Sequence, residues 1–230
     1  MIPRIENQLP KIKHATDILV VDDDSPDGTA QAVTKLQEQF ANLYLLTGPK
    51  KGLGAAYIRG MRYSMEKLKA DVVVEMDADL SHKPEDLPRL IAEIDKGADL
   101  VIGSRYVKGG KVPQDWSFLR AANSRWGNRF ARYIAGIDDV RDCTAGYRAI
   151  RTKLLRRIDL DTLRVKGYSF QMKLLFEAFV LGAKIKEIPI EFHERKIGHT
   201  KIGPWDIIEF IWTAFKLRDR RLRLGKRFRI

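Results

Sequence analysis

Residues 72–90, VVVEMDADLSHKPEDLPRL, place an apolar run, two carboxylates and the beginning of a helical pattern directly after one another. The apolar run at 72–76 predicts a buried strand, and the spacing of apolar residues over 85–96 predicts a helix. Asp77 and Asp79 fall on the turn between the two. This stretch therefore predicts a strand–turn–helix unit with acidic side chains at the carboxyl end of its strand.

The same unit recurs on both sides of this stretch. Further apolar runs predict strands at 18–21, 43–46 and 100–102, and helical patterns cover 29–40 and 54–68. Such alternation is typical of parallel βαβ units with helices on both faces of a sheet. The predicted fold class is therefore α/β, with a mainly parallel sheet flanked by helices.

Polar residues follow three of the predicted strands. They are the acidic cluster Asp22-Asp23-Asp24, the pair Asp77 and Asp79, and the segment Gly103-Ser104-Arg105. Folds of this class place their sites beyond the carboxyl ends of the strands. We therefore expect the three groups to meet at one edge of the sheet.

The second half of the chain has a less regular pattern. It predicts helices over 117–135 and 167–181 and strands over 147–151 and 185–192. Residues 205–217 predict one more helix with a broad apolar face. Its polar residues are Asp206, Glu209, Thr213 and Lys216.

Composition limits the class of protein. The 230 residues, 44% hydrophobic and 9% aromatic, suit one large domain with a substantial core and argue against a disordered chain. The single cysteine, Cys143, excludes an internal disulfide and a cysteine-ligated zinc site and favours a reducing compartment. No apolar run reaches the roughly 18 residues of a spanning helix, and residues 1–13 lack the apolar stretch of a signal peptide. We expect a soluble or peripheral protein.

The chain is strongly basic, and much of the excess lies near its C-terminus. It has 42 Lys and Arg residues against 30 Asp and Glu residues, a formal net charge of +12. Residues 216–230, KLRDRRLRLGKRFRI, hold eight basic residues and one acidic residue, which accounts for +7 of that charge. This balance indicates a polyanionic partner such as a nucleic acid, a phosphorylated substrate or an anionic membrane.

Asp77 and Asp79 have the chemistry of a divalent-cation site. Mg²⁺ is typically held by one or two carboxylates together with substrate phosphates. Acids in front of Pro84 and Glu85 also suit the start of a helix, so the pattern alone leaves a capping role open. The position directly after a buried strand favours the cation site.

The groups around this turn suit a nucleotide. Three acids at 22–24 exceed what capping needs and can accept hydrogen bonds from a base or ribose, although Ser25 or Asp27 can cap the following helix. Lys51 and Gly54 place a cation and a small residue near a helix start, which suits a phosphate. Arginines that can surround an anion, or lie as solvated surface charges, recur at strand ends and turns: Arg105, Arg120, Arg125, Arg148 and Arg195.

Seven segments, in this order, resemble the family 2 glycosyltransferases with the GT-A fold. They are VVDDDSPDGT (20–29), KGLGAAYIRG (51–60), MDADLSHKPEDLPRL (76–90), IGSRYVKGG (102–110), TAGYRAI (144–150), GYSFQM (167–172) and FHERKIGHTKIG (192–203). Within that family the segments are most similar to the dolichyl or polyprenyl phosphate mannose synthases. The resemblance extends from about Asp17 to Gly203.

The resemblance implies an activity and a domain organisation. Family members of this kind transfer mannose from GDP-mannose, with inversion, to the phosphate of a polyprenyl phosphate, with Mg²⁺ or Mn²⁺ as cofactor. Residues 1–203 would form the GT-A domain, and residues 204–230 an amphipathic helix and basic tail. No nucleic-acid partner is expected.

The resemblance also implies roles for the matching residues. The donor nucleotide would be bound by Asp22, Asp23, Lys51, Gly54 and Asp77. The metal would be held by Asp77, Asp79 and Ser81. The acceptor phosphate would be bound by Arg120, Ser124 and Lys201. The residues expected to act in catalysis are Asp79, Arg105 and Arg195.

Three departures from the family pattern stand out. Family members open with a strand followed by Pro-Thr-Tyr-Asn-Glu, whereas residues 1–7, MIPRIEN, keep at most the Ile-Pro. We therefore expect the first strand to be missing or that edge to be rebuilt. Lys173 stands where an acid commonly follows the Phe-Gln, and Ser81 replaces a frequent Gln.

Other functions remain open. A related enzyme could use UDP-glucose or another donor. A protein degenerate through loss of the first strand could bind a nucleotide sugar or a nucleic acid without catalysing transfer, and donor hydrolysis without transfer would be its signature. ILVVDDDSPDG (18–28) also resembles the opening of a response-regulator receiver. The residues at 77–82 and 103–106 do not fit a receiver, which needs a single phosphoacceptor Asp and a later Lys-Pro.

The C-terminal segment suggests where such an enzyme would work. The helix at 205–217 carries Trp205, Phe210, Trp212 and Phe215, and the basic tail follows it. Apolar burial combined with attraction to acidic lipids is typical of helices that lie on a membrane. The alternative is that this helix packs on the core or on another copy. We expect a cytoplasmic protein, peripheral on the cytoplasmic face of an anionic membrane.

Overall fold

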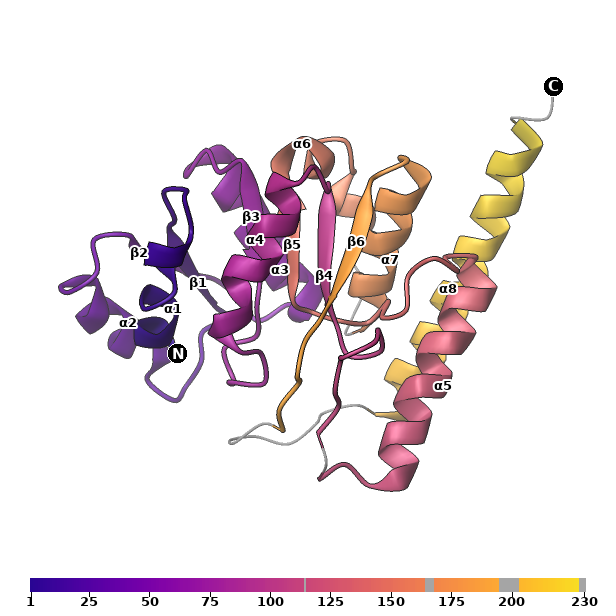
Figure 1. The fold of residues 1–230 in the computed structure, drawn as a ribbon, viewed down its shortest axis with the longest axis horizontal. Coiled ribbons are helices and arrows are strands. Elements are labelled where there is room, and N and C mark those ends of the chain that lie inside the picture. The colour runs from indigo at the N-terminus through magenta and orange to yellow at the C-terminus, as the bar shows by residue number, and fades with distance from the viewer. Residues whose placement is uncertain (114, 164–167, 195–202, 228–230) are drawn as a thin grey trace.

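The computed structural model describes residues 1–113, 115–163, 168–194 and 203–227. Within these ranges six strands form two sheets with helices packed around them (Figure 1). β1 (Ile18–Asp22) and β2 (Leu43–Thr47) form a parallel pair. The larger sheet has the strand order β3-β5-β4-β6. The predicted α/β fold class is confirmed.

The larger sheet contains one antiparallel strand. Its members are β3 (Val72–Glu75), β5 (Arg148–Arg151), β4 (Leu100–Ser104) and β6 (Ile185–Pro189). β4 and β6 are parallel, whereas β5 lies between β3 and β4 and runs antiparallel to both. An apolar pattern identifies a strand but not its direction, so only the pairing reveals this arrangement.

The longer helices agree with those predicted apart from their ends, whereas two short helices were not predicted. The longer ones are α2 (Thr29–Gln37), α3 (Leu53–Glu66), α4 (Leu87–Asp95), α5 (Phe118–Ala135), α7 (Tyr168–Val180) and α8 (Pro204–Arg227). The short ones are α1 (Ile2–Glu6), α6 (Thr152–Leu155) and the 3₁₀ turns η1 (Leu9–Lys11), η2 (Pro84–Asp86) and η3 (Leu160–Leu163).

Alternate residues of β4 separate two cores. Leu100 and Ile102 pack with residues of α3, α5, α7 and α8, whereas Val101 packs with Leu90 and Ile94 of α4. Successive side chains of a strand point to opposite faces of the sheet, which explains the division. The described segments directly after β4 and β6 run toward the lower edge of the molecule in Figure 1, and α5 begins at that edge.

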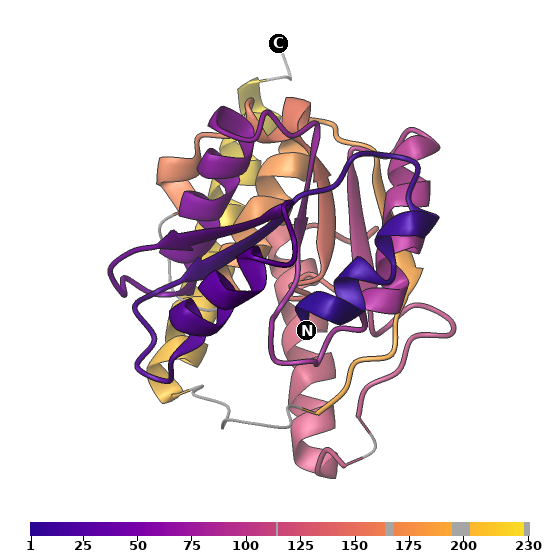
Figure 2. The ribbon, with the colours of Figure 1, turned by 90° about the vertical axis from the view of Figure 1, so that its left-hand side faces the viewer.

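The N-terminal edge is built from helix rather than strand. Ile2 and Ile5 of α1 pack in one cluster with Ile18 and Leu43 of the small sheet. Prolines occupy the first turns of α1 and η1, where the missing N–H costs nothing. Among the described strands β1 pairs only with β2, and Figure 2 shows the two sheets side by side with their strands running in different directions. In the described residues α1 and η1, and no strand, precede β1.

α8 is longer than predicted, and one face of it packs on the domain. Thr213, Ala214 and Leu217 are buried against the body of the protein. Arg220 forms an ion pair with Glu177 of α7, and Arg221 donates to the carbonyl of Gly136, which ends α5. The basic segment is therefore not simply a solvated tail, because part of it holds the helix in place.

No helix in the described part of the chain is long and apolar enough to cross a membrane.

Candidate active site

The turn after β3 holds Asp77 and Asp79 through neighbouring side chains. The hydroxyl of Tyr57, on α3, donates to Asp77 Oδ1 at 3.1 Å. Burial raises the pKa of Tyr57 well above its ordinary value, so the phenol keeps the proton that it donates. Ser81 donates to Asp79 Oδ1 from its backbone nitrogen at 3.0 Å and its hydroxyl at 2.5 Å. Both carboxylates are thus positioned by the protein itself.

His82 anchors the backbone of the same turn. Its Nδ1 accepts from the Asp77 N–H at 3.1 Å, and its ring stacks on Tyr147 at 5.0 Å and meets Phe192 edge-on at 5.4 Å. Burial lowers the pKa of His82, which favours the neutral ring that this hydrogen bond requires. Leu80 has a φ of +67°, a left-handed conformation that costs a side-chain-bearing residue about 1–2 kcal/mol. The anchored neighbours hold this strained turn.

The two carboxylates fit a divalent cation that also binds phosphate. Asp77 keeps 29% of its side chain exposed, and Gly146 stands beside it, since a Cβ there would lie 3.7 Å from Asp77 Oδ1. Nowhere in the described ranges do three His, Cys, Asp or Glu side chains cluster as a complete metal site. Two carboxylates plus substrate phosphates are the donor set that Mg²⁺ commonly takes. Ser81 is fully buried with its hydroxyl on Asp79, so its role as a ligand stays a prediction.

α3 brings the first acidic cluster to this turn. Tyr57 bonds Asp77, and Arg59, two residues later, forms an ion pair with Asp23 at 2.5 Å. Asp22 is buried and accepts from the backbone nitrogen of Ser25 at 3.2 Å. The carboxyl ends of β1 and β3 belong to different sheets rather than to one edge, and contacts with the same helix, α3, hold both of them.

Asp27 and Gly28 build the turn before α2, in which Gly28 is the N-cap residue and has no side-chain cap hydrogen bond. Asp27 accepts from the backbone nitrogen and hydroxyl of Thr29 at 3.1 and 2.6 Å, and Gly28 has a φ of +80° before α2. These residues build the turn. Gly54 is buried in the first turn of α3, and Lys51 is exposed just before it. Contact of either residue with a phosphate stays a prediction.

Arg105 is held in a buried ion pair that the sequence does not reveal. Its Nε and Nη2 donate to the two carboxylate oxygens of Asp142, each at 2.7 Å, and Nη2 also donates to Thr144 at 2.8 Å. Burial by itself would raise the pKa of Asp142, but the charge of Arg105 and its hydrogen bonds hold that pKa below its ordinary value. The guanidinium also lies 5.5 Å from the centre of the Phe192 ring. Arg105 therefore has a structural role beside its predicted catalytic one.

Arg120 and Ser124 lie on the first half of α5. Arg120 Nη1 donates to both oxygens of Glu194 at 2.8 and 3.0 Å. The hydroxyls of Ser124 and Tyr106 share a hydrogen bond of 2.6 Å. Arg120 thus contacts a residue that follows β6, and Ser124 contacts a residue that follows β4. Arg195, predicted to act in catalysis, and Lys201, predicted to bind the acceptor phosphate, lie outside the described residues.

Arg148 is neither a phosphate ligand nor a surface charge. It is fully buried and donates to the carbonyls of Gln171 at 2.8 Å and Cys143 at 3.0 Å. Gln171 in turn donates to Glu75, the residue at the end of β3. Burial is the main cause that raises the pKa of Glu75 to about 7. This network supports the strand that carries Asp77.

Several residues of the site could not be assigned from the sequence. They are Tyr57, His82, Asp142, Gln171 and Glu194. All except Asp142 lie inside the segments that carry the family resemblance. Their partners are 5 to 96 residues away along the chain, so only the folded structure brings them together.

The α/β architecture with the acidic turn after β3 is that of the GT-A glycosyltransferase fold. The structure is similar to that of glucosyl-3-phosphoglycerate synthase from Mycobacterium tuberculosis in complex with Mn²⁺ and UDP-glucose, with a TM-score of 0.60 and 16% identity over 94% of this chain and 74% of that chain. The complex of the same synthase with phosphoglyceric acid has a TM-score of 0.59 and 17% identity over 94% and 76%. At these identities the likeness establishes the fold.

The family model of glycosyl transferase family 2 matches residues 4–159, and the chain belongs to that family. It is 46% identical to the undecaprenyl-phosphate mannosyltransferase of Micrococcus luteus over 217 residues, 91% of this chain and 88% of that protein. It is 41% identical to the polyprenol monophosphomannose synthase of Mycolicibacterium smegmatis over 226 residues, 97% and 81% of the two chains. The resemblance inferred from the seven segments is confirmed, and the response-regulator alternative is wrong.

Proposed function

We propose that this protein transfers mannose from GDP-mannose, with inversion, to the phosphate of a polyprenyl phosphate. The observation that carries the proposal is the positioned turn of Asp77 and Asp79 in a chain 46% identical to an enzyme named for mannose transfer to undecaprenyl phosphate. Asp77 and Asp79 would hold Mg²⁺ or Mn²⁺. When bound, the cation would stabilise the charge of the departing diphosphate.

For this reaction the main task of the protein would be to position the donor and the acceptor. An acceptor phosphate with a second pKa of about 6 is already largely ionised at neutral pH, so it needs no strong general base. Asp22 and Asp23 would contact the nucleoside, while Arg120 and Ser124 would bring the acceptor phosphate to the opposite side of the sugar. A near-attack arrangement of two bound reactants removes much of the barrier.

A transfer assay tests this function. The protein is incubated with Mg²⁺ or Mn²⁺, a short-chain polyprenyl phosphate and either GDP-mannose or UDP-glucose, and lipid-linked sugar is measured. We expect product from GDP-mannose. Product from UDP-glucose alone would favour the related enzyme with a different donor. Loss of donor without any lipid-linked sugar would favour a degenerate binder.

Replacing Arg120 should separate the two substrates. Because Arg120 is proposed to bind only the acceptor, Arg120→Ala should raise the acceptor KM by about 10-fold or more, as expected for a lost charged hydrogen bond. The affinity for GDP, measured by calorimetry, should not change. An equal loss of GDP affinity would contradict the acceptor role.

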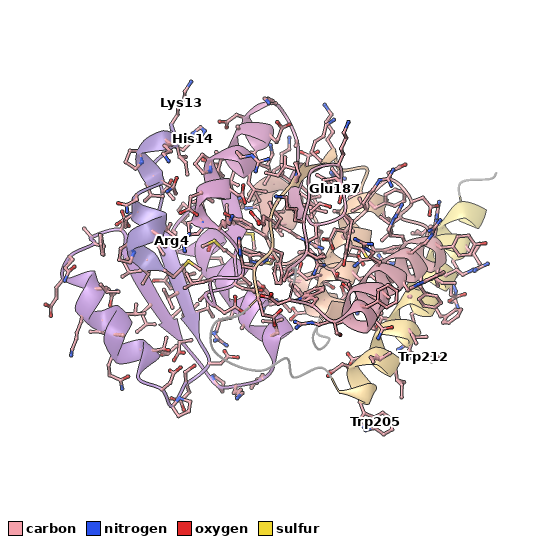
Figure 3. All side chains as sticks on the ribbon, turned by 60° about the horizontal axis from the view of Figure 1, so that its bottom comes forward. Arg4, Lys13, His14, Glu187, Trp205 and Trp212 are labelled. Carbon is pink, nitrogen blue, oxygen red and sulfur yellow. The ribbon has the colours of Figure 1, made fainter. Side chains whose placement is uncertain are left out.

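We also propose that α5 and α8 lie on an anionic membrane surface. Their outward faces carry a set of exposed aromatic side chains, here called the outer aromatic face: Phe118, Trp126, Tyr133, Trp205, Trp212 and Phe215. The two helices pack on each other, with Phe130 and Phe215 in edge-to-face contact at 6.1 Å. Figure 3 shows Trp205 and Trp212 pointing away from the body of the protein.

Charge and position support this membrane contact. Arg125 and Arg129 lie exposed among the aromatic residues of α5, and Arg218 lies exposed on α8. Aromatic rings at the headgroup level together with basic residues are typical of interfacial helices. Basic residues near an anionic surface contribute about 1 kcal/mol each. Because Arg120 and Ser124 lie on α5, this contact would bring the acceptor site to the lipid, at the cytoplasmic face.

Loss of the outer aromatic face should weaken membrane binding. Trp126→Ser with Trp212→Ser should reduce sedimentation with anionic liposomes several-fold, whereas use of a water-soluble short-chain acceptor should persist. Val180→Ser, at an exposed apolar position on α7, serves as the matched control. High salt should weaken binding of the wild type, because surface charge is screened. Unchanged sedimentation of the double variant would rule out this contact surface.

A further inference from the structure

Two donors at the start of α5 converge on a single carboxylate. The indole Nε1–H of Trp116 donates to Glu194 Oε2 at 2.5 Å, and Arg120 Nη1 donates to both oxygens of the same group at 2.8 and 3.0 Å. The Arg120 guanidinium lies over the Trp116 ring, 4.4 Å from its centre. Trp116 and Arg120 thus form an anion cage, which the carboxylate of Glu194 fills.

The cage is favourable for an anion for two further reasons. Arg120 lies in the first turn of α5, whose start is capped by the Ser117 side chain accepting from the Arg120 backbone N–H at 3.2 Å. The N-terminal end of a helix carries partial positive charge. The stacked indole also restricts the guanidinium, so less side-chain freedom is lost when a ligand binds.

Glu194 is held weakly enough to be replaced. The Arg120 and Glu194 side chains are 39% and 36% exposed, and ion pairs at such exposure contribute little net stability. A phosphate monoester at neutral pH carries more negative charge than a carboxylate and offers three acceptor oxygens. It should therefore compete well for the same donors.

The cage is linked to the acidic turn by packed rings. Trp116 meets Phe192 edge-on at 6.1 Å, and Phe192 meets His82 at 5.4 Å. His82 accepts from the Asp77 N–H, and the backbone nitrogen of His193 donates to the Ser81 carbonyl at 3.0 Å. An anion in the cage would thus be connected to the turn of Asp77 through Phe192 and His82.

We propose that Glu194 occupies the place of the acceptor phosphate until the acceptor binds, and that the Trp116 N–H and Arg120 then pass from the carboxylate to the phosphate. The inference rests on the proposed function, because it takes a polyprenyl phosphate as the acceptor. In this arrangement Glu194 competes with the acceptor phosphate for the same two donors, and Trp116 is a ligand of that phosphate.

Two substitutions test these roles in opposite directions. Glu194→Gln removes the competing charge and should lower the acceptor KM by about two- to fivefold, the effect of a lost exposed ion pair, with the donor KM and kcat unchanged. Trp116→Phe keeps a ring beneath Arg120 but removes the N–H, and it should raise the acceptor KM by about fivefold. If Glu194 and Trp116 had only a structural role, the two substitutions would change kcat or the free energy of unfolding instead of the acceptor KM.

Glu191→Gln is the matched control. Glu191 lies three residues before Glu194, accepts from Lys83 at 2.7 Å and has a similarly exposed side chain, at 44%. The Glu191→Gln substitution changes the charge of the same segment by the same amount as Glu194→Gln, and it alters no residue of the cage. An equal fall in acceptor KM for Glu191→Gln would show a general charge effect and would overturn the inference.

A binding measurement separates this inference from the proposed function. Geranyl phosphate is titrated calorimetrically into the wild type, Glu194→Gln and Trp116→Phe proteins. Tighter binding to Glu194→Gln and weaker binding to Trp116→Phe would support the cage even if no mannose were transferred, a result that would count only against the proposed function. Equal affinities in the three proteins would overturn the inference even where the wild type transfers mannose.

Discussion

Asp79→Asn should lower mannose transfer by two or more orders of magnitude while leaving thermal unfolding nearly unchanged. Loss of a charged ligand removes several kcal/mol of transition-state stabilisation at a metal-assisted site. The asparagine keeps the Oδ1 that accepts from Ser81, so the turn should retain its conformation. Initial rates at saturating GDP-mannose and a melting curve of the variant provide the two measurements.

The control for Asp79 is an acidic residue far from the site. Asp95, on α4, pairs with His14 at 2.8 Å at the protein surface, and Asp95→Asn should leave transfer unchanged. Transfer by the wild type should also stop in EDTA and recover when Mg²⁺ or Mn²⁺ is added back. Full activity of Asp79→Asn, or of the wild type in EDTA, would disprove the metal role of this turn.

Arg105→Ala should cost about 3–5 kcal/mol of unfolding free energy, because it leaves the carboxylate of Asp142 buried without its partner. Asp142 is fully buried and Arg105 keeps only 8% of its side chain exposed. Chemical denaturation of the variant measures this loss. The same substitution should abolish transfer, whether Arg105 contacts a phosphate or only shapes the site.

A double substitution separates these two roles. Arg105→Met with Asp142→Leu replaces the buried ion pair with apolar side chains, and such replacements are often neutral or stabilising. If Arg105 also binds a phosphate, the double variant should regain stability but remain inactive. Recovery of both stability and transfer would show that Arg105 is purely structural. A double variant as unstable as Arg105→Ala would contradict the explanation based on the buried charge.

The arginines show that a local sequence pattern does not determine whether a charged side chain is buried or exposed. Arg148 and Arg125 are both arginines beside expected turns or helices, yet one is fully buried and the other exposed. Burial of a guanidinium depends on carbonyls and carboxylates from other parts of the chain, such as Gln171 and Cys143 for Arg148. The local pattern contains none of this information.

α8 illustrates a second ambiguity. The sequence predicts an apolar helix followed by a basic tail, with packing and membrane contact as alternatives. The structure shows packing on one face, through Ala214 and Leu217, and exposed Trp205 and Trp212 on another. A helix that is apolar on most sides can satisfy both alternatives at once, and only its neighbours decide which side is covered.

By itself, the sequence determined the strands, the longer helices and the acidic turn at Asp77 and Asp79, because these follow from local periodicity and from residues adjacent along the chain. The tertiary structure alone decided the antiparallel direction of β5, the helical N-terminal edge and the partners of the charged groups. Asp142 reaches Arg105 across 37 residues and Glu194 reaches Arg120 across 74. Contacts of this kind depend on how the elements pack, and packing is a property of the whole chain rather than of any segment.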